Sequence, residues 1–310
     1  MLGEVTGDTA RVQIPTNLRC SKRSWWLALA VLATLIASPG HAKTKRPNSG
    51  KNLVQIPYTL HKLDNGMNVI FHQDHSQPLV VVNINMQVGS RDEVQGRTGF
   101  AHLFEHLMFM GTNRVPIKKF DQWMEREGGW NNAWTSNDRT DYYDVAPSHA
   151  LPLLLWMEAD RMTSLGKEID LAKLNTQREV VRNERRQQVE NQPYAKARLR
   201  LPELLYPKGH PYHHPVIGSH EDLEAATVGD VRAFFEQHYV PSHASLVVAG
   251  DFESGPALES IQKLFGSWKS SSNEPRKAVK QEAKINGVVR ETIEDKVTLP
   301  KVIMAWLSPK

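Results

Sequence analysis

The stretch of residues 100–110 constrains the fold of this chain most, because it is apolar on nearly every side. Three ionisable residues interrupt it: His102, Glu105 and His106. Residues three and four apart lie on one face of a helix, so the three side chains would share a narrow arc. A helix that is apolar all round belongs in a core, where two imidazoles and a carboxylate are costly unless they are paired or coordinated.

A divalent metal would coordinate the two imidazoles and so offset the cost of burying them. Zinc accepts imidazole nitrogen, and two histidines one turn apart supply half of a tetrahedral shell that keeps one position for water. The order His-x-x-Glu-His inverts the usual zinc-protease pattern and indicates Glu105 as a general base, not a ligand. Structural histidines are the alternative. Gly99 and Gly111 bracket a single helix, and because satisfied core histidines rarely pair with an acid on one face, the metal site is favoured.

A second helix, expected over residues 170–191, contains the third candidate ligand. Its apolar stripe recurs at three- and four-residue steps and ends at Glu184, whereas Glu179 points about 140° away. Glu184 is therefore the carboxylate expected to face inward. The members of the stripe are Leu174, Gln177, Val180, Val181 and Glu184. The arginines of this helix are interpreted as a solvated face rather than a substrate clamp; they are Arg178, Arg182, Arg185 and Arg186.

The rest of residues 56–269 alternates between strand and helix signals. Asn65-Gly66 predicts a hairpin, and alternating apolar residues over 80–88 predict a strand with one face in the core. A second hairpin is expected over 131–143 and a buried strand over 244–250. The loop 207–215 carries three histidines, but its prolines favour loop packing over a second metal site. Further helices are expected at 120–127, 148–164, 227–239 and 255–268.

The two ends of the chain differ in composition from this middle part. A basic segment precedes the 13-residue apolar run 25–37, and small residues follow, so residues 1–42 are typical of a secretory signal peptide. Cleavage there would remove the single cysteine, Cys20, and give a periplasmic or secreted protein without stable membrane insertion; an uncleaved anchor is the alternative. Residues 43–55 are expected to form a polar linker.

After residue 269 the chain becomes polar again, so residues 270–284 are expected to be a linker. Residues 285–310 then look like the first strands, 288–293 and 302–307, of a second domain that is incomplete in this chain or supplied by another one. The net charge of +4 is modest. Basic residues are spread over helix faces without interleaved aromatics, which argues against nucleic-acid binding.

Four motifs in order make the chain similar to the pitrilysin/insulinase family of zinc peptidases, and within it to the bacterial branch that resembles processing peptidases. The resemblance extends over about residues 56–252. The motifs are residues 99–109 around the two histidines, 132–136 with Thr140 and Tyr143, 178–184, and 239–241 with 247–251.

The resemblance implies zinc held by His102, His106 and Glu184, with Glu105 as the base. It also implies that Asn132 and Ala133 belong to an edge strand that binds an extended peptide by strand addition. The implied activity is that of a zinc-dependent endopeptidase on extended or unfolded peptides, with a homologous partner subunit as a possible partner. Gln177 departs from the family, since many relatives have a second acidic residue there.

The expected fold is α+β, a mainly antiparallel sheet with helices packed on one face, plus the start of a second similar domain. Two rival functions remain. One is a non-catalytic, peptide-binding or chaperone-like subunit of a two-chain peptidase complex, against which the intact motif and Glu184 count. The other is structural zinc in a binding module, which would require a fourth protein ligand that does not stand out in the sequence.

Overall fold

The computed structural model of this protein describes residues 56–269, 276, 279 and 282–308. The signal peptide and polar linker expected over 1–55, and most of the linker expected over 270–284, lie outside the described residues, so these remain predictions. Among the helices that are described, none combines the length and the apolar character needed to cross a membrane.

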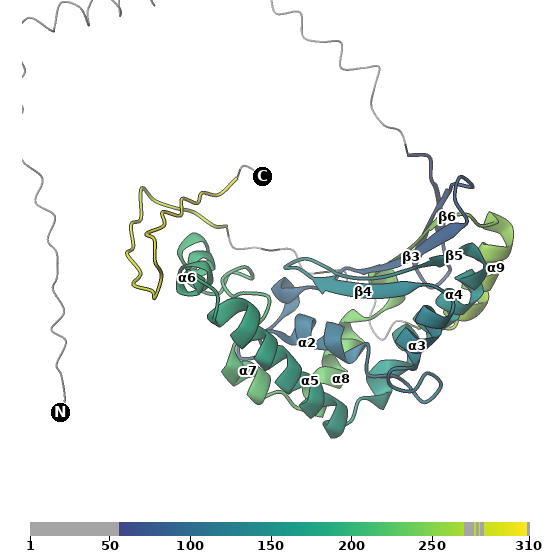
Figure 1. The fold of residues 1–310 in the computed structure, drawn as a ribbon, viewed down its shortest axis with the longest axis horizontal. Helices are drawn as coiled ribbons and strands as arrows, with labels where there is room; N and C mark the ends of the chain where they lie inside the picture. Colours follow the sequence, from purple (N-terminus) through teal and green to yellow (C-terminus); the bar gives the residue numbers. More distant parts are fainter. Residues whose placement is uncertain (1–55, 270–275, 277–278, 280–281, 309–310) are drawn as a thin grey trace, which may run out of the picture. The chain divides into compact units, whose positions relative to one another are not determined.

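A six-stranded sheet forms one layer of the fold, in the order β1-β2-β6-β3-β5-β4 (Figure 1). Four of the five neighbouring pairs are antiparallel, and only β2 and β6 run parallel. The mainly antiparallel sheet is therefore confirmed, as are both predicted hairpins, β1-β2 and β4-β5. The strands are β1 Thr59–Lys62, β2 Asn68–Gln73, β3 Leu79–Met86, β4 Trp130–Thr135, β5 Thr140–Pro147 and β6 Ala244–Gly250.

The two faces of the sheet differ, as the alternation in the central strand β3 predicts. Val80, Val82, Ile84 and Met86 are almost completely buried, whereas the residues between them are only half-buried. Figure 1 shows α2, α3, α5 and α8 together on one side of the sheet. The prediction that helices pack on one face is thus confirmed. The alternation in β3 agrees with it, because side chains two apart in a strand point to the same face.

Eight α-helices are described in this part of the chain. The four expected outside the site correspond to α3, α4, α8 and α9, and the predicted cap of α8 is present, since the Thr227 side chain accepts a hydrogen bond from the Asp230 N–H. Helices α6 and α7 were not predicted, because α6 contains Pro202 and α7 has only five residues. The helices are α2 Phe100–Leu107, α3 Lys119–Arg126, α4 Leu151–Glu168, α5 Leu171–Glu184, α6 Ala195–Leu205, α7 His220–Glu224, α8 Val228–His238 and α9 Ser254–Phe265.

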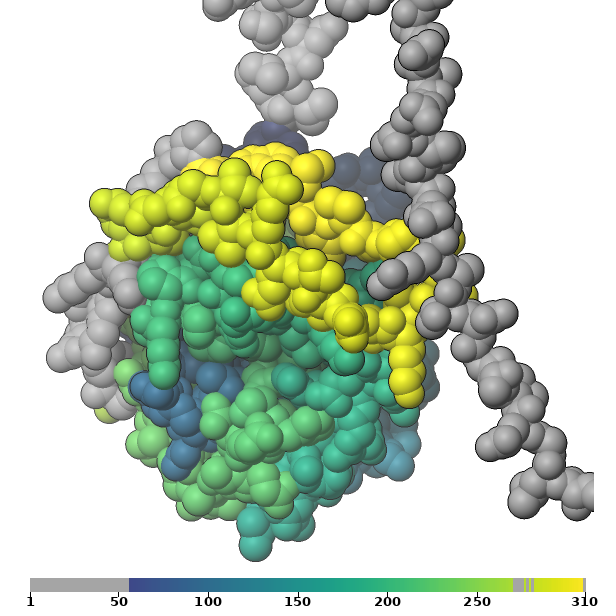
Figure 2. Space-filling model, turned by 90° about the vertical axis from the view of Figure 1, so that its left-hand side faces the viewer, coloured from purple at the N-terminus to yellow at the C-terminus, as the bar shows by residue number. Residues whose placement is uncertain are grey.

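The strands expected over 288–293 and 302–307 are not formed among the described residues. The assignment of residues 285–310 to the start of a second domain stays a prediction. A strand needs a neighbour for its backbone groups, and this segment lies along helix α6 instead (Figure 2). The Tyr194 hydroxyl donates to the Leu299 carbonyl at 2.9 Å, and the Lys196 ammonium donates to the Glu294 carbonyl at 3.1 Å. An apolar groove lies between α6 and this segment, and none of the predicted site residues lines it.

Candidate metal centre

Helix α2 begins at a tight approach between two parts of the chain. Gly99, just before the helix, has φ of +87°, and a Cβ there would lie 2.8 Å from the Ile217 carbonyl oxygen. Only glycine meets both conditions without strain. The buried Glu93 carboxylate accepts hydrogen bonds from the N–H groups of Gly99 and Ala101 at 2.9 and 2.8 Å. It thereby satisfies donors that a helix N-terminus leaves unpaired.

The predicted buried helix is confirmed, although it ends at Leu107 and continues to Met110 only as a turn. Its apolar residues are covered by the sheet and the neighbouring helices; the buried ones are Phe100, Ala101, Leu103, Phe104 and Leu107. This burial fixes the rotation of the helix, and so it determines the direction in which the polar side chains of the arc point.

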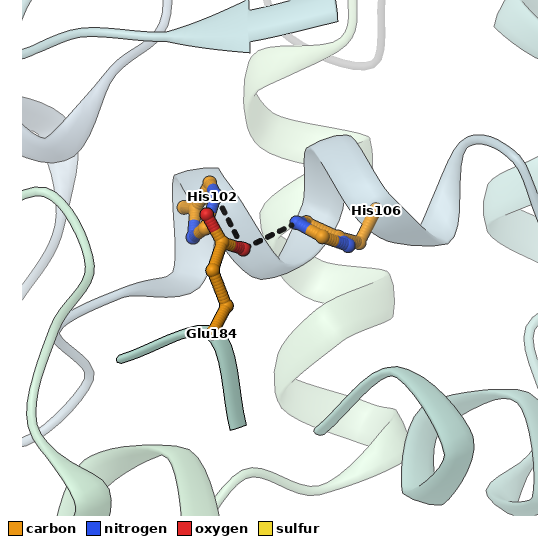
Figure 3. Close-up of side chains that lie close together, drawn as sticks. All are labelled: His102, His106 and Glu184. Atoms are coloured by element: carbon orange, nitrogen blue, oxygen red, sulfur yellow. Dashed lines mark ion pairs between the residues drawn. The ribbon is translucent and has the colours of Figure 1, made fainter. Parts of the chain in front are cut away.

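His102 and His106 point from α2 towards Glu184 at the end of α5 (Figure 3). The Nε2 atoms of the two histidines lie 3.6 and 3.3 Å from Glu184 Oε2. One potential ligand atom from each residue lies within 4.8 Å of the other two. Two imidazole nitrogens and one carboxylate oxygen are a donor set that zinc accepts. The residues present therefore fit a zinc ion with one coordination position left for water or substrate.

The electrostatics of these residues are compatible with metal binding. Burial lowers the pKa of His102 to about 4, and the neighbouring His106 acts in the same direction while Glu184 opposes it. His102 is accordingly neutral at pH 7, the form in which imidazole binds metals. The hydrogen bond from His106 is the main reason why the pKa of Glu184 is lowered, so its carboxylate is ionised.

Glu105 lies on the same helix but outside this group of ligand atoms. Its Oε2 accepts a hydrogen bond from the Thr135 hydroxyl on β4. Burial raises the pKa of Glu105, and the hydrogen bond from Thr135 opposes that rise. A carboxylate with a raised pKa is a better proton acceptor, as a general base requires.

Helix α5 presents Glu184 towards α2, as its phase predicts. The Glu184 side chain is 25% exposed, whereas that of Glu179 is 57% exposed and accepts a hydrogen bond from Arg182 at 2.8 Å. Val180 is 43% exposed, so its assignment to the buried stripe is wrong. The buried face of α5 is narrower than the stripe expected from the sequence. Leu174 and Val181 are the two apolar residues of this helix that are buried.

The arginines of α5 and of the π-helical turn that follows it, Arg185–Glu190, do not form a solvated face, so that interpretation is wrong for three of the four. Arg178 donates to the carbonyls of Leu223 and Ala226, Arg182 donates to Glu224, and Arg185 donates to the Gly218 carbonyl. Guanidinium groups stabilise the unpaired carbonyls at a helix C-terminus. These contacts attach the Glu184 end of α5 to the segment around α7. The regular spacing of arginines at 178, 182 and 185 was the signal for this contact.

Strand β4, which contains Asn132 and Ala133, lies at the edge of the sheet. The Asn132 side-chain oxygen accepts a hydrogen bond from the Ala133 N–H at 2.8 Å. The edge position predicted for these residues is confirmed, while their binding to a peptide remains a prediction. The amide nitrogen of Gln177 lies 2.7 Å from Met110 Sδ.

The three histidines of loop 207–215 serve packing and loop structure, as the prolines indicated. His210 is buried and stacks on Tyr206, with ring centroids 4.7 Å apart. His213 hydrogen-bonds through Nδ1 to the Tyr206 carbonyl at 2.8 Å. His214 Nδ1 lies 3.6 Å from the Glu93 carboxylate, so this loop supports the start of α2.

Comparison with known proteins agrees with this geometry. Residues 68–213 match the family model described as insulinase (peptidase family M16), and residues 225–310 match the model described as peptidase M16 inactive domain. The zinc protease PqqE of Helicobacter pylori is 32% identical over 250 residues, covering 80% of this chain and 53% of that protein. A probable mitochondrial-processing peptidase subunit beta of Arabidopsis thaliana is 25% identical over 260 residues, covering 83% of this chain and 48% of that protein.

The fold comparison gives the same family. The crystal structure of a protease from Helicobacter pylori superposes with a TM-score of 0.70 at 30% identity, covering 74% of this chain and 55% of that one. The chain thus spans about half the length of the relatives it matches. Enzymes of the M16 family are zinc-dependent, and the donor set described above fits that metal. The chain belongs to the insulinase (M16) family of peptidases.

Proposed function

We propose that this chain is the zinc-binding unit of an endopeptidase that hydrolyses bonds in extended or unfolded peptides. One observation carries the proposal: the facing nitrogens of His102 and His106 and an oxygen of Glu184 lie within 4.8 Å of one another, beside the buried carboxylate of Glu105. Relatives named as zinc proteases support it.

His102, His106 and Glu184 would hold the zinc ion, since a neutral imidazole and an ionised carboxylate are the forms that bind it. When bound, zinc supplies a Lewis acid that lowers the pKa of a water molecule and polarises a peptide carbonyl. Burial of α2 keeps the two imidazoles in one orientation, and the arginine contacts of α5 fix the end of the helix that presents Glu184.

Glu105 is proposed as the general base. It accepts a proton from the attacking water at a carboxylate oxygen and returns it to the amine that leaves when the peptide bond breaks. Its buried environment raises its pKa, so that it can both take up and release the proton. Its Oε2 is already engaged by Thr135.

The substrate would bind along β4. An extended peptide adds as a further strand at a sheet edge, where main-chain hydrogen bonds hold it regardless of sequence. The N–H of Ala133 is occupied by the side chain of Asn132, and a peptide carbonyl would replace that contact.

We also propose that residues 1–42 direct export to the periplasm or outside the cell. A homologous partner subunit is proposed as well, on the similarity to a processing-peptidase subunit.

The test is zinc content and peptidase activity of the purified protein. We expect about one zinc per chain, loss of hydrolysis on chelation, and its return with added zinc. Glu105→Gln should retain the zinc and lose activity by roughly a hundredfold or more, because an amide cannot accept the proton. Glu125→Gln, an exposed glutamate on α3, is the matched control. A zinc-free protein, or full activity in Glu105→Gln, would refute the proposal, and a zinc-loaded chain that binds peptides without cleaving them would favour the non-catalytic subunit.

A further inference from the structure

A threonine of the edge strand contacts the carboxylate assigned as the base. Thr135 is the last residue of β4, and its hydroxyl donates to Glu105 Oε2. Side chains alternate along β4, so that every second one is half-buried and directed to the same side as Thr135; these are Asn131, Ala133 and Thr135. The strand that would receive a peptide therefore also supplies a hydrogen bond to Glu105.

Several contacts hold Thr135 in place. It pairs with Thr140 across the β4-β5 hairpin, where the two hydroxyl oxygens lie 3.5 Å apart. Thr140 in turn donates to the Val88 carbonyl at 2.9 Å. The hydroxyl of Thr135 is consequently held in place by the sheet, because Thr135 lies within a paired strand.

The turn after Thr135 is attached to the chain that follows β3. The N–H of Ser90 donates to the Ser136 carbonyl at 3.2 Å, and the N–H of Arg91 donates to the Asn137 carbonyl at 2.9 Å. A Cβ on Gly89 would lie only 2.4 Å from the Ser136 oxygen, so this approach requires glycine. The hairpin tip that directly follows Thr135 is therefore anchored through the Ser136 and Asn137 carbonyls.

We infer that Thr135 is a positioning residue: its hydroxyl holds one oxygen of Glu105, so that the other oxygen faces the attacking water while a peptide occupies the same strand. This inference rests on the proposed function and deepens it. A carboxylate that accepts a single hydrogen bond from a rigid donor loses rotational freedom about its terminal bond, and correct orientation of a catalytic group contributes strongly to the rate.

The test compares Thr135→Val, which keeps the shape and removes the hydroxyl, with Thr135→Ser, which keeps the hydroxyl. Misplacement of a catalytic group by about 1 Å can cost roughly a hundredfold in rate, so we expect Thr135→Val to lower kcat at least about tenfold. KM and zinc content should not change, and Thr135→Ser should retain most of the activity. Thr176→Val on α5 is the matched control, because its hydroxyl donates within its own helix, to the Ala172 carbonyl at 2.8 Å.

Crystal structures of zinc-loaded wild type and Thr135→Val give a readout that does not depend on activity. The Glu105 carboxylate should occupy one position in the wild type and shift or spread over several positions in the variant. An unchanged carboxylate position in Thr135→Val would overturn the inference, as would an unchanged kcat or an effect confined to KM. If zinc-loaded wild type cleaves no peptide, the proposed function fails, and the carboxylate positions still decide the role of Thr135.

Discussion

Replacement of Glu184 by glutamine tests the zinc site most directly, because it removes a charge and changes the size of the side chain very little. Glu184 Oε2 is the oxygen that both histidine Nε2 atoms face, at 3.3 and 3.6 Å. Glu179 lies five residues earlier on α5, is 57% exposed and pairs with Arg182. Glu179→Gln removes the same charge from the same helix and is therefore the matched control.

The expected magnitude follows from the share of one ligand in zinc binding. Structural zinc sites with four ligands bind with apparent free energies of about 10–16 kcal/mol, so one ligand accounts for roughly 3 kcal/mol. At about 1.4 kcal/mol per factor of ten, Glu184→Gln should raise the Kd for zinc about a hundredfold or more. Glu179→Gln should change it by less than about threefold, since its carboxylate lies on another face and exposed pairs contribute little.

Competition with a chromophoric chelator measures both dissociation constants. Thermal unfolding provides a second assay: at equal free zinc, a hundredfold weaker site loses about 2.7 kcal/mol of the stabilisation that the metal gives the wild type. Circular dichroism without zinc should show that both variants are folded. Equal weakening by the two substitutions, or an unchanged Kd in Glu184→Gln, would show that the ligand assignment from helix phase is wrong.

Two further predictions concern the core behind the site. Gly166→Ala should lower the free energy of unfolding by about 1–3 kcal/mol or more through overpacking, because its Cβ would lie 2.1 Å from the ring of Phe235. Gly255→Ala is the control, because its Cβ would meet nothing within 4 Å, and it should leave the free energy of unfolding in urea unchanged. Equal effects of the two substitutions would refute this prediction. Tyr239→Phe should cost about 1–3 kcal/mol, because it leaves the hydroxyl of Tyr142, now 2.6 Å from that of Tyr239, buried without this partner. The double Phe variant should cost less than the sum of the singles, and strict additivity would contradict the coupling.

Short sequence patterns, such as a turn dipeptide or an alternation of apolar residues, predicted individual strands and turns correctly. Asn65-Gly66 specified the β1-β2 hairpin, and the alternation of β3 specified which side of the sheet is buried. The spacing of His102 and His106 placed both imidazoles on one face of α2, since this relation depends only on the geometry of the helix. The same spacing predicted a pair of imidazoles that could bind one metal ion, and that binding stays a prediction.

Tertiary packing decided the remainder, because it depends on residues far apart in the chain. The phase of α5 identified Glu184 as the inward carboxylate, but it also assigned Val180 to the core, since periodicity does not show how wide a contact is. The strands expected at 288–293 and 302–307 had suitable side chains, yet a strand forms only beside another strand. The hydrogen bond from Thr135 to Glu105 likewise required β4 to lie against α2. The sequence by itself thus determined which side chains share a face of a helix or strand, and the tertiary structure decided which of them meet, because helical and strand periods are local whereas contacts between elements are not.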